Sequence, residues 1–142
     1  MGKAANSSIS LKQIHVTDNF WNKYVHLVKD VIIPYQWDIL NDKLEDVETS
    51  HCIENFKIAA GEKEGEFQGA VFQDTDVAKW LEAVGFVLNY ERDEKLEELA
   101  DETIELIGRA QQPDGYLNTY FTIKEPDGRW SNLMEGHELY TD

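Results

Sequence analysis

The chain has 142 residues, with 28 acidic side chains against 13 basic ones and a formal net charge of −15 at pH 7. This length suits one domain, and an apolar content of 42% supports a hydrophobic core, which argues against a disordered chain. The acidic excess argues against nucleic acid or an anionic membrane surface as a partner, because both attract clustered lysine and arginine. The first residues lack an apolar signal sequence, and no run reaches the roughly 20 apolar residues of a membrane helix, so we expect a cytoplasmic protein.

The first third of the chain predicts one long helix behind an irregular start. Residues 1–8 are small and polar and predict a disordered leader, while residues 9–16 alternate loosely in hydropathy and predict at most a short extended segment. From residue 20 to 33 apolar side chains recur at helical spacing, with a capping residue expected at positions 17–19. Pro34 should end or kink this helix, because proline lacks the backbone N–H that a helix interior needs.

Beyond Pro34 the apolar spacing predicts helices over residues 35–40, 51–60, 74–90 and 94–111. Residues 41–50 and 62–69 are polar or glycine-containing and predict loops, and Gly61 should stop the helix before it. Asp74 and Asp93 stand where the N-caps of the two long helices are expected. The link between these two helices is short, so we expect them to pack as antiparallel neighbours.

The last part of the chain predicts a small β-like hairpin followed by the start of a helix. Residues 113–115 and 125–128 both combine proline, aspartate and glycine, which is typical of turns. The aromatic and β-branched residues 116–123 between them predict a strand or an extended loop. Residues 133–140 have the pattern of another helix start. The predicted fold class is therefore mainly α, with antiparallel helix pairs and one small hairpin.

Few motifs in the sequence point to chemistry. The chain has one cysteine, Cys52, which excludes an internal disulfide and a metal site of several cysteines. His137-Glu138 matches only the first half of a zinc-binding HExxH motif, because the second histidine is absent. Asp74 and Asp76 either cap a helix or hydrogen-bond a polyhydroxylated ligand. A hydrolase acting through Asp74, Asp76 and Glu138 is a third alternative, and it requires the three carboxylates to share one cleft.

Four segments together resemble the N-terminal part of glycoside hydrolase family 127, the β-L-arabinofuranosidases. They are residues 31–37 (VIIPYQW), 72–83 (FQDTDVAKWLEA), 110–120 (AQQPDGYLNTY) and 136–140 (GHELY). Their order and spacing make the resemblance fairly specific, and it covers the chain from about residue 9 onward. It implies that residues 9–142 are a partial N-terminal segment of a catalytic domain built as an (α/α)6 toroid. It also implies a retaining reaction that releases L-arabinofuranose.

The resemblance implies a site that this chain completes only in part. His137 matches a histidine that contacts arabinose, and Phe72 matches an aromatic residue that lines the same pocket. Asp74 and Asp76 match an acidic pair close to that pocket, whereas Trp80 is interpreted as a packing residue. The family's nucleophilic cysteine, its zinc ligands and its acid/base glutamate have no counterpart here. We therefore expect no catalytic residue and no metal or cofactor in this chain.

Two functional hypotheses follow. In the first, the chain is an N-terminal fragment or a short relative of such a glycosidase, contributes one wall of a pocket for an arabinose-containing carbohydrate, and is inactive alone. In the second, it is an autonomous helical interaction module. A part of a toroid lacks its neighbouring helices, so its apolar faces would be uncovered, and association into a homodimer would bury them.

Overall fold

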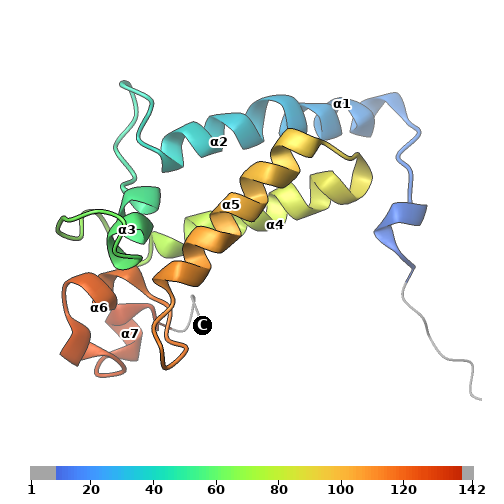
Figure 1. Ribbon diagram of the computed structural model, residues 1–142. Coiled ribbons are helices and arrows are strands. Elements are labelled where there is room, and N and C mark those ends of the chain that lie inside the picture. Colours follow the sequence, from blue (N-terminus) through green and yellow to red (C-terminus); the bar gives the residue numbers. More distant parts are fainter. Residues whose placement is uncertain (1–8, 139–142) are drawn as a thin grey trace, which may run out of the picture.

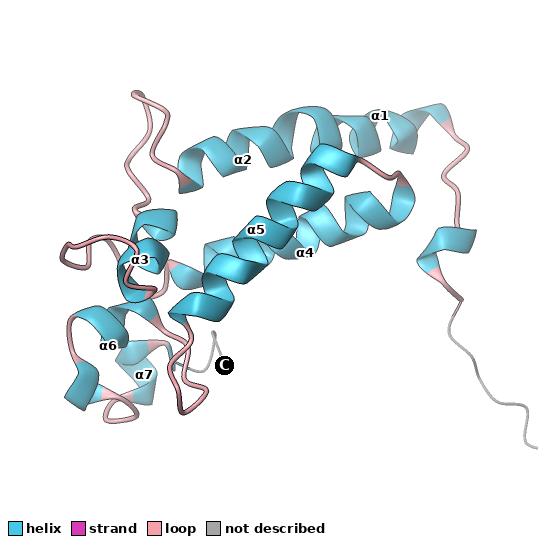
Figure 2. Ribbon diagram, in the orientation of Figure 1, coloured by secondary structure: helices cyan, strands magenta, loops and turns pink. Residues whose placement is uncertain are grey.

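The computed structural model describes residues 9–138, which form helices joined by loops (Figures 1 and 2). A long helical arm (residues 19–40) runs along one side, and an antiparallel pair of long helices (residues 74–90 and 94–110) lies against it (Figure 1). Shorter helices (residues 52–59, 119–123 and 133–136) gather at one end of this pair (Figure 1). No strand occurs within residues 9–138, and no helix there has the length and apolar character needed to cross a bilayer.

The helical arm passes through Pro34 without ending. Its three consecutive segments are α1 (Asn19–Leu27), the π-helical η2 (Val28–Ile32) and α2 (Ile33–Leu40). The backbone N–H of Ile33 donates to the carbonyl of Val28, five residues back, so the helix is widened directly before the proline. A wider turn accommodates the proline ring that would otherwise strike the preceding turn. Pro34 therefore does not end the helical run, and the irregularity predicted near Ile33 takes the form of a π turn directly before the proline.

The clearest sequence prediction, a pair of long antiparallel helices, is confirmed. The two helices are α4 (Asp74–Tyr90) and α5 (Glu94–Ala110). Asp93 caps α5 as expected, since its Oδ1 accepts from the backbone N–H groups of Lys95 and Leu96 at 3.2 Å each. Only residues 91–93 separate the helices, so the second folds back along the first.

The core lies where α4 meets its neighbours. Trp80 is 4% exposed, its ring centroid lies 4.5 Å from that of Trp37, and its indole N–H donates to the carbonyl of Ile33 at 3.1 Å. These contacts confirm Trp80 as a packing residue and tie α4 to α2. The other buried apolar residues of this core include Leu40, Ile53, Phe56, Val77, Val84, Val87, Leu106 and Ala110.

The short helix α3 (Cys52–Ala59) ends just before the glycine that was expected to stop it. Its N-cap position is His51, which adopts a left-handed conformation with φ 56°. The Asp42 carboxylate accepts from the backbone N–H groups of Ser50 at 2.7 Å and His51 at 2.9 Å, which fixes the end of the preceding loop. Gly61 follows the helix with φ 73°, a value that glycine adopts without steric cost.

The predicted β-like hairpin is wrong, because the chain between the two turns forms a short helix, α6 (Thr119–Ile123), and no strand. The second turn is the 3-10 helix η3 (Pro126–Gly128), and the short helix α7 (Leu133–Gly136) follows it. The Asn118 side chain accepts from the backbone N–H of Phe121 at 3.0 Å and so caps α6, which the aromatic composition of the segment conceals. The turn at residues 113–115 is confirmed, with Gly115 at φ 90°.

The two ends of the described chain also differ from the prediction. The N-terminal segment, predicted as at most a short extended segment, holds a short 3-10 helix, η1 (Leu11–Gln13). The helix predicted over residues 133–140 stops at Gly136, because His137 turns into the left-handed region with φ 52°. The predicted leader (residues 1–8) and positions 139–142 lie outside the described residues.

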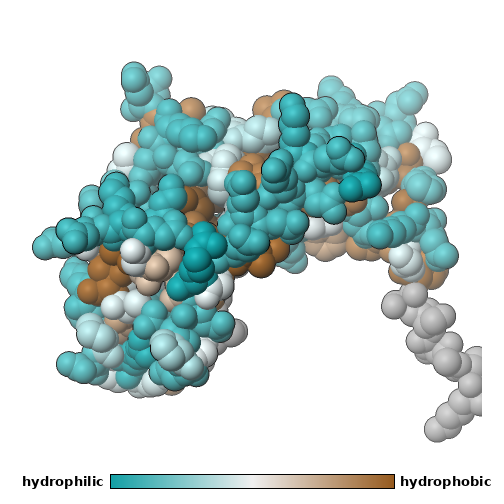
Figure 3. All heavy atoms as spheres, in the orientation of Figure 1, coloured by the Kyte–Doolittle hydropathy of each residue, from teal (hydrophilic) through white to brown (hydrophobic). Residues whose placement is uncertain are grey.

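Apolar side chains remain exposed along α1 and η2. Phe20, Trp21, Tyr24 and Val31 are between 45% and 60% exposed. Trp21 and Tyr24 line a hollow of about 560 Å³ between η1, α1 and α4. Figure 3 shows that hydrophobic atoms reach the surface in separate patches among hydrophilic ones on the face seen there. The described part of the chain therefore leaves apolar surface uncovered.

Candidate functional site

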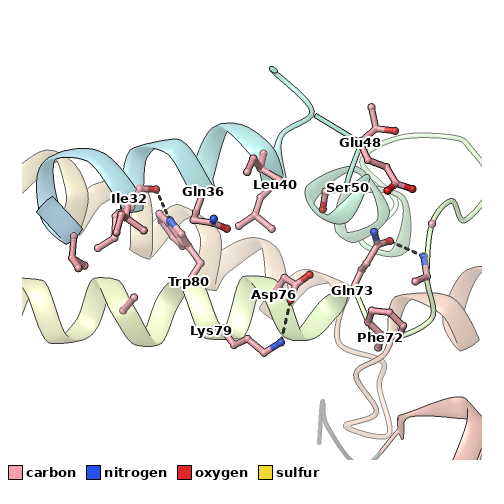
Figure 4. A pocket seen from close by; sticks show the side chains of 17 residues that line it. Ile32, Gln36, Leu40, Glu48, Ser50, Phe72, Gln73, Asp76, Lys79 and Trp80 are labelled. Atoms are coloured by element: carbon pink, nitrogen blue, oxygen red, sulfur yellow. Dashed lines mark hydrogen bonds and ion pairs between the residues drawn. The ribbon is translucent and has the colours of Figure 1, made fainter. Parts of the chain in front are cut away.

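Two adjoining hollows flank the first turns of α4. The larger, of about 790 Å³, lies between α2, the loop at residues 48–50 and α4. The second, of about 720 Å³, is lined by residues of α4 and by His137. Phe72 and Lys79 border both hollows. Figure 4 labels the residues around the larger hollow, which include Gln36, Leu40, Glu48, Ser50, Phe72, Gln73, Asp76 and Trp80.

The structure brings together Phe72, from the middle of the sequence, and His137, from near its end. Their ring centroids lie 5.4 Å apart in an edge-on arrangement with an interplanar angle of 65°. Phe72 is 48% exposed, so part of its ring is open to a ligand. An apolar ring beside an imidazole offers one surface for the C–H groups of a sugar and hydrogen-bonding groups for its hydroxyls. These two sequence-predicted residues therefore share one hollow.

Asp74 lies at the same end of α4 but points into the protein. It is 4% exposed, and its oxygens accept from the backbone N–H and the hydroxyl of Thr119, both at 2.6 Å. The prediction of Asp74 as N-cap is wrong. Gln73 takes that position, and its side chain accepts from the N–H of Ala70 at 2.9 Å instead of capping the helix. Burial raises the pKa of Asp74, while the bonds from Thr119 act in the opposite direction. These contacts favour a structural role that joins α4 to α6.

Asp76 is accessible and belongs to a polar strip on the first turns of α4. Its Oδ1 lies 3.1 Å from the ammonium of Lys79, which also donates to the hydroxyl of Thr75 at 3.2 Å. The side chains of Lys79 and Asp76 are 69% and 46% exposed. Lys79 was missed by the sequence reasoning, although its spacing of three and four residues from Asp76 and Thr75 puts all three on one helix face.

Glu138 has a different environment from either aspartate. It is 0% exposed, and its carboxylate accepts from the hydroxyl of Tyr116 at 2.5 Å and from the backbone N–H of Trp130 at 2.8 Å. Asp74 and Glu138 are thus buried and hydrogen-bond different residues. Of the three carboxylates only Asp76 is accessible. This arrangement does not give the shared open cleft that hydrolysis by the three carboxylates requires.

The described residues do not fit the zinc site that the resemblance implies for the parent family. Within residues 9–138, no three histidine, cysteine, aspartate or glutamate side chains are grouped so that they could hold a metal ion. The Cys52 thiol is buried and donates to the carbonyl of Gln73 at 2.9 Å. Burial raises the pKa of Cys52 well above its usual range, and the negative charges of Asp74 and Asp76 add to the effect. The thiol is therefore not poised as a ligand or nucleophile.

Comparisons with known proteins agree with one another. Residues 13–141 match the profile of the β-L-arabinofuranosidase GH127 catalytic domain. The non-reducing end β-L-arabinofuranosidase of Bifidobacterium longum subsp. longum is 39% identical over 89% of this chain and 22% of its own length.

Two solved structures are also similar. A GH127 β-L-arabinofuranosidase from Geobacillus stearothermophilus T6 is 62% identical over 90% of this chain and 20% of its own, with a TM-score of 0.88. A second GH127 β-arabinofuranosidase is 30% identical over 93% of this chain and 21% of its own, with a TM-score of 0.80. The predicted class, mainly α and part of an (α/α)6 toroid, is confirmed apart from the hairpin. The chain spans about a fifth of the length of these relatives.

Proposed function

The chain belongs to the family of GH127 β-L-arabinofuranosidase catalytic domains, and from this premise we propose that it forms one wall of a pocket for an L-arabinofuranose residue. The observation that carries the proposal is the meeting of Phe72 and His137 at one hollow, with a centroid distance of 5.4 Å. The relatives act on arabinofuranosides according to their names, which supports a pentose of this kind as the ligand.

In this proposal each residue has a distinct task. The His137 imidazole exchanges hydrogen bonds with sugar hydroxyls, since one ring nitrogen can donate and the other can accept. Phe72 presents its half-exposed ring to the C–H face of the sugar. Asp76 and Lys79 form the polar rim beside them and can bind further hydroxyls. Asp74 acts through Thr119 by holding the first turn of α4 in place, rather than by touching the sugar.

We also propose that the chain alone does not cleave arabinosides. A retaining glycosidase needs a nucleophile and an acid/base group on either side of the bond to be broken. The resemblance supplies neither within the matched segments, and the buried thiol of Cys52, with its raised pKa, is a poor nucleophile. The chain would therefore bind one sugar residue weakly and release it unchanged.

The test is a titration of the purified chain with L-arabinose followed by NMR, together with an assay on an aryl β-L-arabinofuranoside. We expect weak binding that His137→Ala reduces about tenfold or more, and no turnover above buffer. The matched control is His26→Ala, which changes an exposed histidine on α1 and should leave the affinity unchanged. Turnover that His137→Ala abolishes would contradict the proposed inactivity, and equal loss in both variants would contradict the role of His137.

The exposed apolar face of α1 favours a second candidate function, a helical module that self-associates. Phe20 is 60% and Trp21 59% exposed, and both lie beside the half-exposed Tyr24. A homodimer would bury these rings, and Trp21→Glu should then weaken it. Sedimentation over a range of protein concentrations tests this, and a monomer at the highest concentration excludes it.

A further inference from the structure

The histidine of the proposed sugar wall is followed directly by a fully buried carboxylate. Glu138 is 0% exposed, and its Oε1 accepts from the hydroxyl of Tyr116 at 2.5 Å. Both carboxylate oxygens also accept from the backbone N–H of Trp130, at 2.8 and 3.0 Å. Hydrogen bonds to an ionised carboxylate are among the strong ones, so this contact fixes the backbone next to His137.

Tyr116 and Trp130 are themselves held by further contacts. The Arg129 guanidinium lies 4.0 Å from the ring centroid of Tyr116, and the Trp130 ring meets Tyr116 edge-on at 5.3 Å. Trp130 adopts φ 61°, a left-handed conformation that is costly for a residue with a side chain. The bonds from its N–H to Glu138 help to hold it there. The carboxylate is therefore attached to a packed cluster rather than to a free loop.

The residue before His137 packs closely against Phe121. A Cβ at Gly136 would lie 3.0 Å from the Cζ of Phe121, a tight contact that requires the ring to move by a few tenths of an ångström. His137 then takes a left-handed conformation with φ 52°. With the backbone held before and after it, the imidazole is set edge-on to Phe72.

We propose that Glu138, through its bonds to Tyr116 and Trp130, is a positioning residue that holds the His137 imidazole in the hollow beside Phe72. The sugar-binding part of this inference rests on the proposed function. A binding group must be held within about half an ångström of its productive position to use its full binding energy. The carboxylate supplies that constraint without touching the ligand. Loss of its bond to Tyr116 loosens the backbone at His137 and lets the imidazole leave Phe72.

The test compares Tyr116→Phe with Tyr120→Phe in the full chain. Both changes remove one hydroxyl that donates to a glutamate, but the Tyr120 hydroxyl bonds Glu125 at 2.8 Å in an exposed pair. The first readout is the chemical shift of the His137 ring protons, because the ring current of the neighbouring Phe72 changes this shift. The signals are assigned by their absence in His137→Gln. The second readout is the affinity for L-arabinose. We expect Tyr116→Phe to move the His137 signals toward free histidine and to weaken binding about fivefold to tenfold, while Tyr120→Phe changes neither.

The outcomes separate the two proposals. If the His137 signals move in Tyr116→Phe but no variant binds L-arabinose, the positioning role stands and the sugar-binding proposal fails. If Tyr116→Phe lowers only the unfolding temperature and leaves the His137 signals and the affinity unchanged, the positioning role is overturned. Should Tyr116→Phe not fold, Glu138→Gln is the second variant, because it keeps the size of the side chain and an acceptor for the N–H of Trp130 but removes the charge from the contact with Tyr116. The His137 signals should then move in the same direction, and unchanged signals would overturn the positioning role.

Discussion

The helix pair α4–α5 and the segment from residue 111 to 138 are ordered by different means. In the pair, apolar residues recur at helical spacing, and the cap Asp93 bonds N–H groups only two and three residues away. In the later segment the helices are short, and two buried carboxylates form hydrogen bonds between residues that are far apart in the sequence. Asp74 bonds Thr119, 45 positions on, and Glu138 bonds Tyr116, 22 positions back.

This difference matters for function because the proposed sugar wall lies at the junction of the two regions. Phe72 precedes α4, whereas His137 lies near the end of the later segment, and they meet at one hollow. The helix pair supplies a rigid base, and the buried carboxylates set the second region against it. Variants in the pair should therefore cost stability, while variants in the junction should also disturb the hollow.

The largest expected effect is that of Trp80→Ala in the helix pair. Trp80 is 4% exposed, packs on Trp37 and donates to the carbonyl of Ile33, so its removal leaves a cavity and breaks this hydrogen bond. We expect the free energy of unfolding to fall by about 3–5 kcal/mol, measured by urea denaturation with circular dichroism. A loss below about 1 kcal/mol would show that α2 and α4 are not joined here.

Asp74→Ala should have the next largest effect because it breaks the link between the two regions. It leaves the buried N–H and hydroxyl of Thr119 without their acceptor, which costs about 2–3 kcal/mol. A double-mutant cycle with Thr119→Ala measures the coupling. Strictly additive effects would mean that the two residues do not interact.

The pH dependence of Asp74→Asn tests the same link in another way. Burial raises the folded-state pKa of Asp74 above its ordinary value of 3.8, so the folded chain holds this proton more tightly than the unfolded chain. Its contribution to the free energy of unfolding is therefore greatest at low pH and is lost as the pH rises from 3.8 through the raised value. The stability of the natural chain relative to Asp74→Asn should fall from acidic to neutral pH in urea titrations, and a rise would contradict the direction of the shift.

The smallest expected effect is that of Asp93→Ala, which removes a local cap. It leaves the first N–H groups of α5 to water and should cost about 1 kcal/mol. Amide hydrogen exchange should rise in the first turn of α5 and stay unchanged at His137. Loss of the contact between His137 and Phe72 would show that the two regions are not ordered separately.

The same contrast explains which parts of the structure could be predicted from the sequence. Apolar spacing and Asp93 predicted α4 and α5 because their signals lie within a few neighbouring residues. The helix α6 was missed because its start depends on the Asn118 cap and on Asp74, whose partnership with Thr119 leaves no trace in local spacing. His137 and Phe72 were found through the family resemblance. Glu138 and Asp74 are buried, whereas Asp76, two residues from Asp74, is accessible. This difference depends on contacts with residues far away in the sequence, so local spacing does not predict it.

The most direct test of the proposed sugar wall is a map of backbone amide shifts in the full chain during titration with L-arabinose. The account predicts that the affected amides cluster at Phe72, Thr75, Lys79 and His137, where the second hollow lies. Shifts confined to the apolar hollow at Trp21 and Tyr24, or no shifts at the highest sugar concentration, would contradict it.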